Sequence, residues 1–176
     1  MSALGNVIPE VVNDFNVYKD GTKLIGISSE IELPELEAIT ETVSGAGILG
    51  ELDTPATGQF SSTSITIPFS NLHEDLFEVI DPTSPVDLTL RGSQQCIDPS
   101  TGTTDYYPVK IVCRGKATNI NLGTFKKGGE GEPEVELSLS YFKVDINGTV
   151  GVELDKLNSV YVVNGTDMLA KIKKQI

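Results

Sequence analysis

The stretch that decides the fold is residues 33–69, LPELEAITETVSGAGILGELDTPATGQFSSTSITIPF, which joins an acidic segment to an alternating strand through a glycine-rich loop. The loop keeps Ile48 and Leu49 among glycines. Exposed loops carry few large apolar groups, so these side chains indicate that another chain covers the loop. The alternative is a loop that folds over the core of its own subunit. The feature favours assembly over catalysis.

The clearest strand in the chain is predicted over residues 59–69. Its period of two separates one set of side chains, Thr63, Ile65, Ile67 and Phe69, from a set of small hydroxyls, Ser62, Ser64 and Thr66. An aliphatic face opposite a hydroxyl face indicates that one side packs on a core and the other side contacts water.

Before this strand, the pair Asp20-Gly21 predicts a tight turn between strands at residues 11–19 and 22–33. Pro34 follows, and it indicates an edge or a bend there because proline cannot donate a ladder hydrogen bond. After the strand, a helix of about ten residues is expected, starting at Asn71 as cap and ending at Asp81-Pro82.

The second half of the chain is again rich in strand signals. We expect strands at 86–97, 105–117, 118–126, 134–146 and 149–163. Asn147-Gly148 is typical of a type I′ hairpin turn. In 134–146 the apolar positions change from odd to even after Tyr141, which predicts a β-bulge or a corner. Residues 168–176 could close the chain as a short helix.

These elements predict a mainly β fold in one domain, residues 1–176. We expect two packed antiparallel sheets, as a sandwich or a partly open barrel, with one short flanking helix and a possible C-terminal helix.

The charge of the chain is unevenly distributed. The net charge is −12, and residues 1–88 hold 15 acidic and 2 basic side chains, whereas residues 89–176 hold 10 and 11. An acidic surface repels nucleic acid, which is bound through lysine and arginine. The asymmetry could orient identical subunits, or it could be only a solvated surface.

Three further features of the sequence limit the possible classes of function. Cys96 and Cys113 are the only cysteines, and we expect both to be reduced and largely buried. No apolar run reaches the roughly 20 residues that cross a bilayer. The first 20 residues lack a basic start and an apolar core, so no secretory signal is expected.

The sequence offers no catalytic constellation. His73 is the only histidine, and no nucleophile motif accompanies it. Residues 45–50 match G-x-G-x-x-G by letter, but the acidic Glu51 and Asp53 follow, which oppose a phosphate. We therefore expect no catalytic residue, no cofactor and no metal.

An ordered series of short motifs supports a family resemblance. The series is Ile8-Pro-Glu10, Phe15-Asn-Val-Tyr18 with Asp20-Gly21, Leu33-Pro-Glu-Leu36, Thr40-Glu41, Gly45-x-Gly47, Gly50-Glu51 and Ile67-Pro-Phe69. In this order the motifs resemble those of the major tail tube proteins of contractile-tailed bacteriophages. The resemblance is densest over residues 8–80.

The resemblance implies hexameric rings in which strands of all subunits join one continuous inner barrel. The rings would stack into a hollow tube, which a contracting sheath drives through the host envelope and through which DNA passes without specific binding. It also implies contacts with sheath, tape-measure and baseplate proteins, and a place in the virion after assembly in the host cytoplasm. The alternatives are the tube of an R-type bacteriocin or a type VI secretion system, or a monomeric β-sandwich binding module.

Two sets of site residues follow. The expected inter-subunit loop is Ser44, Gly45, Ala46, Gly47, Ile48, Leu49, Gly50 and Glu51. The candidate lumen-facing residues are Ser62, Ser64, Thr66, Glu134, Glu136, Ser138 and Ser140, for which solvent on the outer wall is the alternative. Burying Ile48 and Leu49 would contribute about 1.5–3 kcal/mol each.

Overall fold

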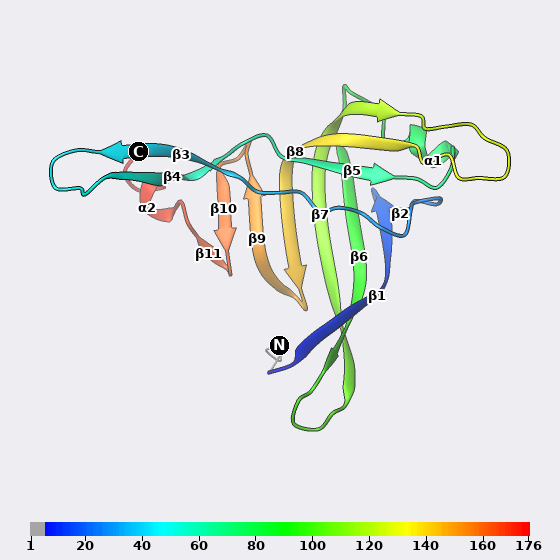
Figure 1. Ribbon diagram of the computed structural model, residues 1–176, viewed down its shortest axis with the longest axis horizontal. Helices are drawn as coiled ribbons and strands as arrows, with labels where there is room; N and C mark the ends of the chain where they lie inside the picture. The colour runs from blue at the N-terminus through cyan, green and yellow to red at the C-terminus, as the bar shows by residue number, and fades with distance from the viewer. Residues whose placement is uncertain (1–5) are drawn as a thin grey trace.

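One large antiparallel sheet forms most of the computed structural model, which describes residues 6–176 (Figure 1). The strand order is β11-β10-β9-β8-β7-β6-β1-β2, and β5 pairs with β8 off this path. The strands are β1 (Ile8–Lys19), β2 (Thr22–Lys23), β5 (Ser64–Pro68), β6 (Val86–Ile97), β7 (Thr104–Asn121), β8 (Glu134–Ile146), β9 (Thr149–Asp155), β10 (Val160–Val163) and β11 (Thr166–Asp167).

A second, two-stranded sheet and two short helices complete the structure. The sheet consists of β3 (Ala38–Ser44) and β4 (Glu51–Phe60), and the helices are α1 (Glu74–Phe77) and α2 (Ala170–Lys173). The predicted fold class is confirmed, and within residues 6–176 the large sheet does not close into a barrel. Residues 1–5, at the start of the segment in which no secretory signal is expected, lie outside the described residues. None of the helices in the described part of the chain is long and apolar enough to cross a membrane.

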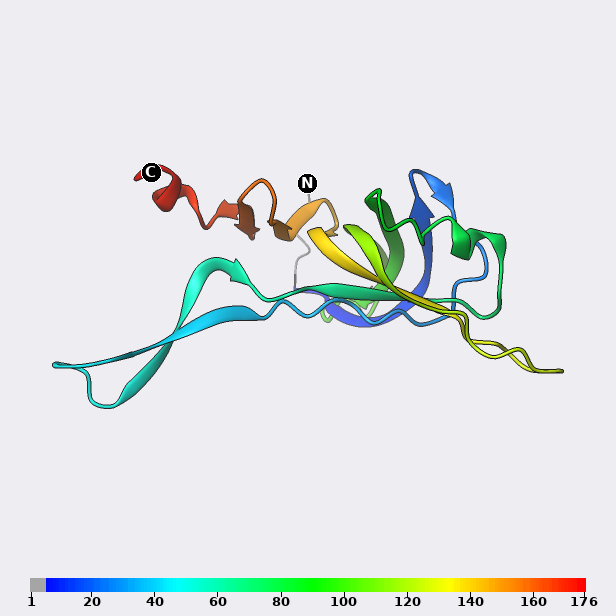
Figure 2. The same ribbon diagram turned by 90° about the horizontal axis from the view of Figure 1, so that it is seen from above.

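The core lies between the bent long strands and the layer that holds β5 (Figure 2). Its most deeply buried side chains come from β5, β6, β7, β8 and the α1 region, and they include Ile65, Ile67, Leu76, Leu88, Cys113, Val135 and Leu137. The alternation predicted for the strand before α1 is confirmed, because Thr63, Ile65, Ile67 and Phe69 are all buried. Cys96 and Cys113 are free and buried, as predicted.

The strand 134–146 contains the β-bulge that its change of apolar phase predicts. Arg114 pairs with Tyr141 and Gly115 pairs with Leu139, so Ser140 is the extra residue of a bulge in β8. Gly115 permits this close approach, because a Cβ there would lie 2.3 Å from the Ser138 carbonyl oxygen. The predicted turn at Asn147-Gly148 is also confirmed, since both residues have positive φ, 51° and 79°.

The predicted strand 22–33 is wrong beyond Lys23. Gly26 has φ +79°, which turns the chain away from β1. Ile27 then forms an isolated bridge with Phe69, and the Ser28 amide donates to the Pro68 carbonyl oxygen at 2.9 Å. The chain therefore crosses to β5 instead of extending the hairpin.

The strand predicted at 59–69 is in fact two strands. The ladder stops at residues 61–63, so Phe60 ends β4 and Ser64 begins β5. Residues 30–37, where Pro34 indicates an edge or a bend, form no strand. The unpredicted strand β3 begins after them at Ala38, and the end of the predicted loop, from Glu51, belongs to β4. Cross-strand pairing between these two segments outweighed their polar composition.

The expected ten-residue helix is only four residues long. His73 caps it in place of Asn71, by accepting from the Asp75 amide at 3.2 Å. Asn71 instead accepts from the Gly131 amide at 2.9 Å, which ties it to the β7–β8 loop. The possible C-terminal helix is present as α2.

Of the remaining strands, β6 and β8 have the predicted bounds. The separate strands expected at 105–117 and 118–126 are one strand, β7, because its ladder with β8 continues as far as Asn121. The strand expected at 149–163 is divided by a turn at 156–159 into β9 and β10. In that turn Asp155 accepts from the amides of Leu157 and Asn158.

Candidate assembly surfaces

The predicted inter-subunit loop is the tip of a long hairpin. This hairpin, β3, β4 and the connection 45–50, is called the arm, and it projects from the body in both views (Figures 1 and 2). Its strands pair from Thr40 with Pro55 out to Ser44 with Glu51. At the tip the Ile48 amide donates to the Gly45 carbonyl oxygen at 3.1 Å. The loop therefore does not fold over its own core.

The outer part of the arm is apolar and exposed on both strands. Ile39, Val43 and Leu52 are exposed along the strands, and Ile48 and Leu49 are exposed at the tip. Val43 and Leu52 are a cross-strand pair, so the apolar surface continues from the tip along one part of the hairpin. Contiguous exposed apolar surface of this kind marks interaction sites.

The base of the arm, in contrast, is held against the body. The ring of Phe60 packs edge to face on Tyr161 in β10, with centroids 5.0 Å apart. Lys156 donates to the Ser61 carbonyl oxygen at 2.7 Å and to the Thr63 hydroxyl at 3.1 Å. Burial lowers the pKa of Lys156. The arm is thus anchored at one end and free at the other.

The candidate lumen-facing residues largely come together on one face. The pairing of β5 with β8 places Ser64 opposite Ser138 and Thr66 opposite Glu136. Glu134 lies next along β8, and Ser140 lies at the bulge, where its hydroxyl donates to the Arg114 carbonyl oxygen at 3.3 Å. Ser62 is exposed but precedes β5. The opposite face of the same strands carries buried aliphatic side chains.

Sequence reasoning missed the contribution of β7 to this polar face. Lys116 pairs with Ser138, Asn119 with Glu136 and Asn121 with Glu134, and the three β7 side chains are exposed. The polar content of residues 116–121 was a weak signal for it, because only the register shift between Ala117 and Asn119 puts Lys116 on the same face as Asn119 and Asn121. The polar face thus extends over three adjacent strands.

Within residues 6–176, the large sheet also has free edges at β1 and β11 that the sequence analysis did not predict. In β1, residues 8–16 pair only with β6, because β2 covers only Tyr18 and Lys19. At the other end the sheet stops at β11, a strand of two residues. Ile8, Val11 and Val12 of β1 are exposed apolar side chains. Unpaired edges present backbone donors and acceptors to another chain.

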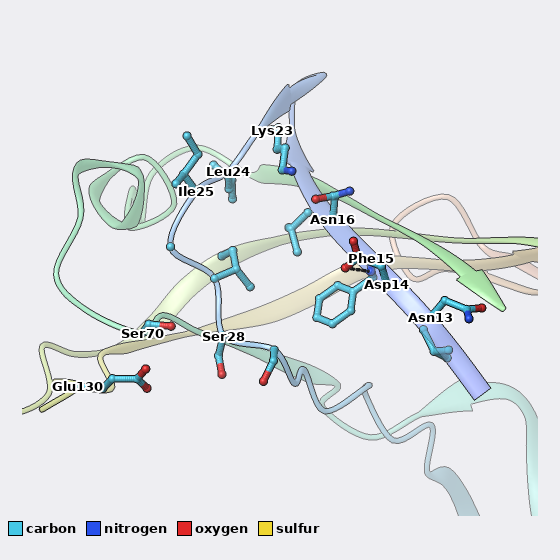
Figure 3. Close-up of a pocket in the computed structure, with 15 residues that line it drawn as sticks. Asn13, Asp14, Phe15, Asn16, Lys23, Leu24, Ile25, Ser28, Ser70 and Glu130 are labelled. Carbon is cyan, nitrogen blue, oxygen red and sulfur yellow. Dashed lines mark hydrogen bonds between the residues drawn. The ribbon is translucent and has the colours of Figure 1, made fainter. Parts of the chain in front are cut away.

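A groove with a volume of about 950 Å³ lies between β1 and the segment 23–29 (Figure 3). Its polar lining comes from Asn13, Asp14, Asn16, Lys23, Ser28, Ser29, Ser70 and Glu130. No histidine is among the residues that line this groove. His73 instead caps α1. No cluster of His, Cys, Asp and Glu that could hold a metal occurs in residues 6–176.

Comparison with known proteins decides the family. Residues 9–176 match the family model of phage tail tube protein FII. This chain belongs to that family. The chain is 26% identical to the tail tube protein of Escherichia phage P2 over 172 residues, which cover 96% of this chain and 98% of that protein. It is 25% identical to the major tail tube protein of Serratia phage KSP20 over 161 residues, 92% of this chain and 91% of the relative.

A solved structure shares the fold of this tail tube protein. It is a chain of an extracellular contractile injection system, from the cryo-EM structure of the PVC sheath/tube terminator in the extended state. The TM-score is 0.54 at 15% identity, and the match covers 81% of this chain and 99% of that chain. The resemblance to tail tube proteins is therefore confirmed. The chain is a phage tail tube structural protein related to contractile injection systems, and a structural family gives no ground to expect catalysis.

Proposed function

We propose that this tail tube protein is the subunit of a hollow tube built from stacked hexameric rings. The open nine-stranded sheet carries the proposal, because a tail tube subunit with two free sheet edges has backbone groups left for its neighbours. The whole chain, residues 1–176, acts as one tail tube domain.

Ring closure follows from the physics of these edges. When the β1 edge of one subunit joins the edge strand of the next, the backbone donors and acceptors of both find partners. A full ring then forms one continuous barrel with no free edge left inside it. The exposed Ile8, Val11 and Val12 lose water-accessible surface in the same step.

The polar face of β5, β7 and β8 suits a water-filled lumen. Ser64, Thr66 and Ser138 bring no large apolar surface, and Glu134 and Glu136 repel phosphate groups. Like charge keeps DNA from adhering to the wall while it passes. The competing position for this face is the outer wall of the tube, where it meets solvent.

The arm supplies contacts outside the ring's barrel. Its exposed tip, residues Ser44–Glu51, reaches another subunit in the same ring or in the next one. Because every subunit repeats this modest apolar contact, the contacts together make the junction between subunits stiff. The sheath, tape-measure and baseplate proteins are the further partners, and the assembled protein is a virion component made in the host cytoplasm.

A second candidate is the tube of a headless injection device, such as an R-type bacteriocin or a type VI system. This alternative is supported by the fold that the chain shares with an extracellular contractile injection system. The two phage relatives favour the phage tail. A monomeric β-sandwich binding module is the remaining alternative, and it leaves the free edges and the arm without a role.

Negative-stain electron microscopy of the full-length protein, together with sedimentation at rising concentration, tests the proposal. We expect hollow rings of one diameter that stack into tubes, with hexamers or their multiples in sedimentation. Dispersed monomers at every concentration would contradict the tube, and saturable binding of a carbohydrate or peptide by that monomer would establish the binding module.

A further inference from the structure

Two elements at opposite ends of the molecule end in uncovered apolar side chains. The arm extends from one end of the long axis and the loop 122–133 between β7 and β8 from the other, in both views (Figures 1 and 2). We call this loop the far loop. Leu49 in the arm is 108% exposed and Phe125 in the far loop is 100% exposed. Each is a large apolar group with no cover from its own chain.

The arm and the outer turn of the far loop carry side chains of opposite charge. The arm carries Glu41, Glu51 and Asp53, all exposed, and it contains no lysine or arginine. The far loop carries Lys126 and Lys127 at its turn, both exposed, and neither has an ion-pair partner within residues 6–176. Complementary charge of this kind orients two surfaces during association.

The acidic residues of the far loop lie nearer its base than the two lysines. The Thr124 amide donates to the Gly131 carbonyl oxygen at 2.7 Å and closes the loop there. Glu130, beside this closure, lines the groove next to Ser28 and Ser70 (Figure 3). Glu132 follows the closure in the chain. The turn beyond it, residues 125–130, therefore presents Phe125 and two lysines at its outer part and Glu130 beside the closure.

Both elements are held at the base and free at the tip. The far loop is tied to the body where the Gly131 amide donates to the Asn71 side chain at 2.9 Å. The arm is tied by the Phe60–Tyr161 ring contact. Anchored bases fix the direction of each element before a partner arrives, which lowers the entropic cost of docking.

We propose that the arm of one subunit docks on the far loop of a second copy of the same chain. Leu49 packs beside Phe125, and the carboxylates of Glu51 and Asp53 lie near Lys126 and Lys127. The contact is head to tail, so its repetition closes a ring or continues as a helix, according to the rotation at each joint. This inference rests on the proposed tube function and names the surface that receives the arm.

Charge reversal tests the pairing. Lys126→Glu with Lys127→Glu should raise the protein concentration needed for assembly by about tenfold or more, and Glu51→Lys with Asp53→Lys should do the same. Combining all four substitutions should restore assembly. Lys171→Glu with Lys174→Glu makes the same change of charge at exposed positions of the C-terminal segment, and we expect it to assemble normally. Circular dichroism and thermal unfolding check that every variant folds.

Cysteine cross-linking tests the geometry. Leu49→Cys combined with Phe125→Cys should give a ladder of disulfide-linked subunits after mild oxidation of assembled protein. A ladder that stops at the hexamer places the contact within a ring, and one that continues places it between rings; either supports the proposal. Leu157→Cys with Phe125→Cys is the control that should give no ladder, since Leu157 is exposed on another surface. The buried Cys96 and Cys113 do not interfere.

The two proposals fail in different ways. If the unmodified protein never assembles, the tube function is wrong and the inference falls with it. If the unmodified protein assembles, but the reversed variants assemble equally well and no ladder forms, the tube function stands and the arm docks elsewhere. Failure of the four-substitution variant to assemble, with each pair alone defective and all variants folded, would also overturn the proposed pairing.

Discussion

The ring of Phe60 meets the ring of Tyr161 edge to face, with centroids 5.0 Å apart and an interplanar angle of 73°. Phe60 is the last residue of β4, and Tyr161 lies in β10 of the large sheet. This contact joins the arm to the body and helps to fix the direction in which the tip projects.

Phe60→Ala should loosen the arm. Loss of the aromatic pair removes about 0.5–1.5 kcal/mol beyond the area buried, mostly from the local stability of the hairpin. Hydrogen exchange should therefore accelerate in β3 and β4 and stay unchanged in β6. Phe125→Ala is the matched control, because Phe125 is fully exposed and its removal should leave exchange in the arm unchanged. Unaltered exchange of the arm in Phe60→Ala would show that other contacts hold it.

Ile48→Asp combined with Leu49→Asp should block assembly and leave the monomer folded. Both side chains are exposed in the isolated subunit, so only the contact with another subunit loses its apolar burial, worth about 1.5–3 kcal/mol per side chain. Sedimentation should show monomers with an unchanged thermal midpoint. Leu157→Asp makes the same chemical change at another exposed position and is the control. If the double variant formed normal tubes, the tip of the arm would not be part of the interface between subunits.

Ser64→Cys should distinguish the lumen from the outer wall. Ser64 is exposed in the isolated subunit and lies on the polar face with Ser138. In assembled tubes, a small maleimide should label the cysteine, whereas a maleimide on a long polyethylene glycol chain should label only subunits at the tube ends. In dissociated subunits both reagents should react. Rapid labelling of intact tubes by the large reagent would place this face outside.

Gly115→Ala should destabilise the subunit. An added Cβ would lie 2.3 Å from the Ser138 carbonyl oxygen, a backbone atom that can move only if the β7–β8 ladder shifts. Overpacking of this kind typically costs about 1–3 kcal/mol, which urea unfolding can measure. Gly151→Ala is the control in β9, where the nearest atom lies at an ordinary 3.8 Å. Equal stability of the two variants would show that the bulge at Ser140 is adaptable.

Cys113 should contribute to alkaline destabilisation. Burial raises the pKa of its thiol from 9.0 to about 12, so the folded state holds the proton more tightly than the unfolded state. The resulting stability is fully present below pH 9.0 and is lost as the pH rises towards 12. Urea unfolding across this range should therefore show a shallower decline for Cys113→Ala than for the unmodified protein. Parallel slopes would contradict the shifted pKa.

Much of the fold could be predicted because its strands alternate clearly. The bounds of β6 and β8, the Asn147-Gly148 turn and the presence of a bulge in β8 all follow from local period and turn chemistry. The apolar phase changes after Tyr141 in the sequence, whereas the extra residue of the bulge is Ser140. Such signals need only neighbouring residues, so one sequence contains them. The Cys96 and Cys113 prediction succeeded for a similar reason, since reduced cysteines are among the most often buried residues.

The errors concern segments whose structure depends on distant partners. β3 is rich in β-branched residues, which suit a strand, but its partner β4 lies beyond the loop 45–50. The segment after Lys23 leaves the hairpin because Ile27 forms a β-bridge with Phe69, a residue far away in the sequence. The helix is short because Asn71 contacts the far loop and His73 caps in its place. None of these pairings leaves a periodic signal in the sequence.

The candidate site could be predicted in part. The composition of the arm tip was enough to single out Ile48 and Leu49. The alternation of apolar and polar residues was enough to predict that Ser64 and Ser138 lie on strand faces that contact water. That these two serines are cross-strand neighbours depends on β5 pairing with β8, which the sequence does not reveal. The free edge of β1 and the far loop likewise became visible only in three dimensions.

The register of β1 has a consequence for the order of events during synthesis. Ile8 pairs with Ile97, so residues 8–16 of the first strand have no partner strand until β6 has left the ribosome, when more than half of the chain has been made. Contacts between such distant segments form late in folding. The ordered edge of β1 therefore arises only after the strands of the core are available. A nascent chain cannot offer that edge to finished subunits, and the chain's own connectivity delays polymerisation until folding is well advanced.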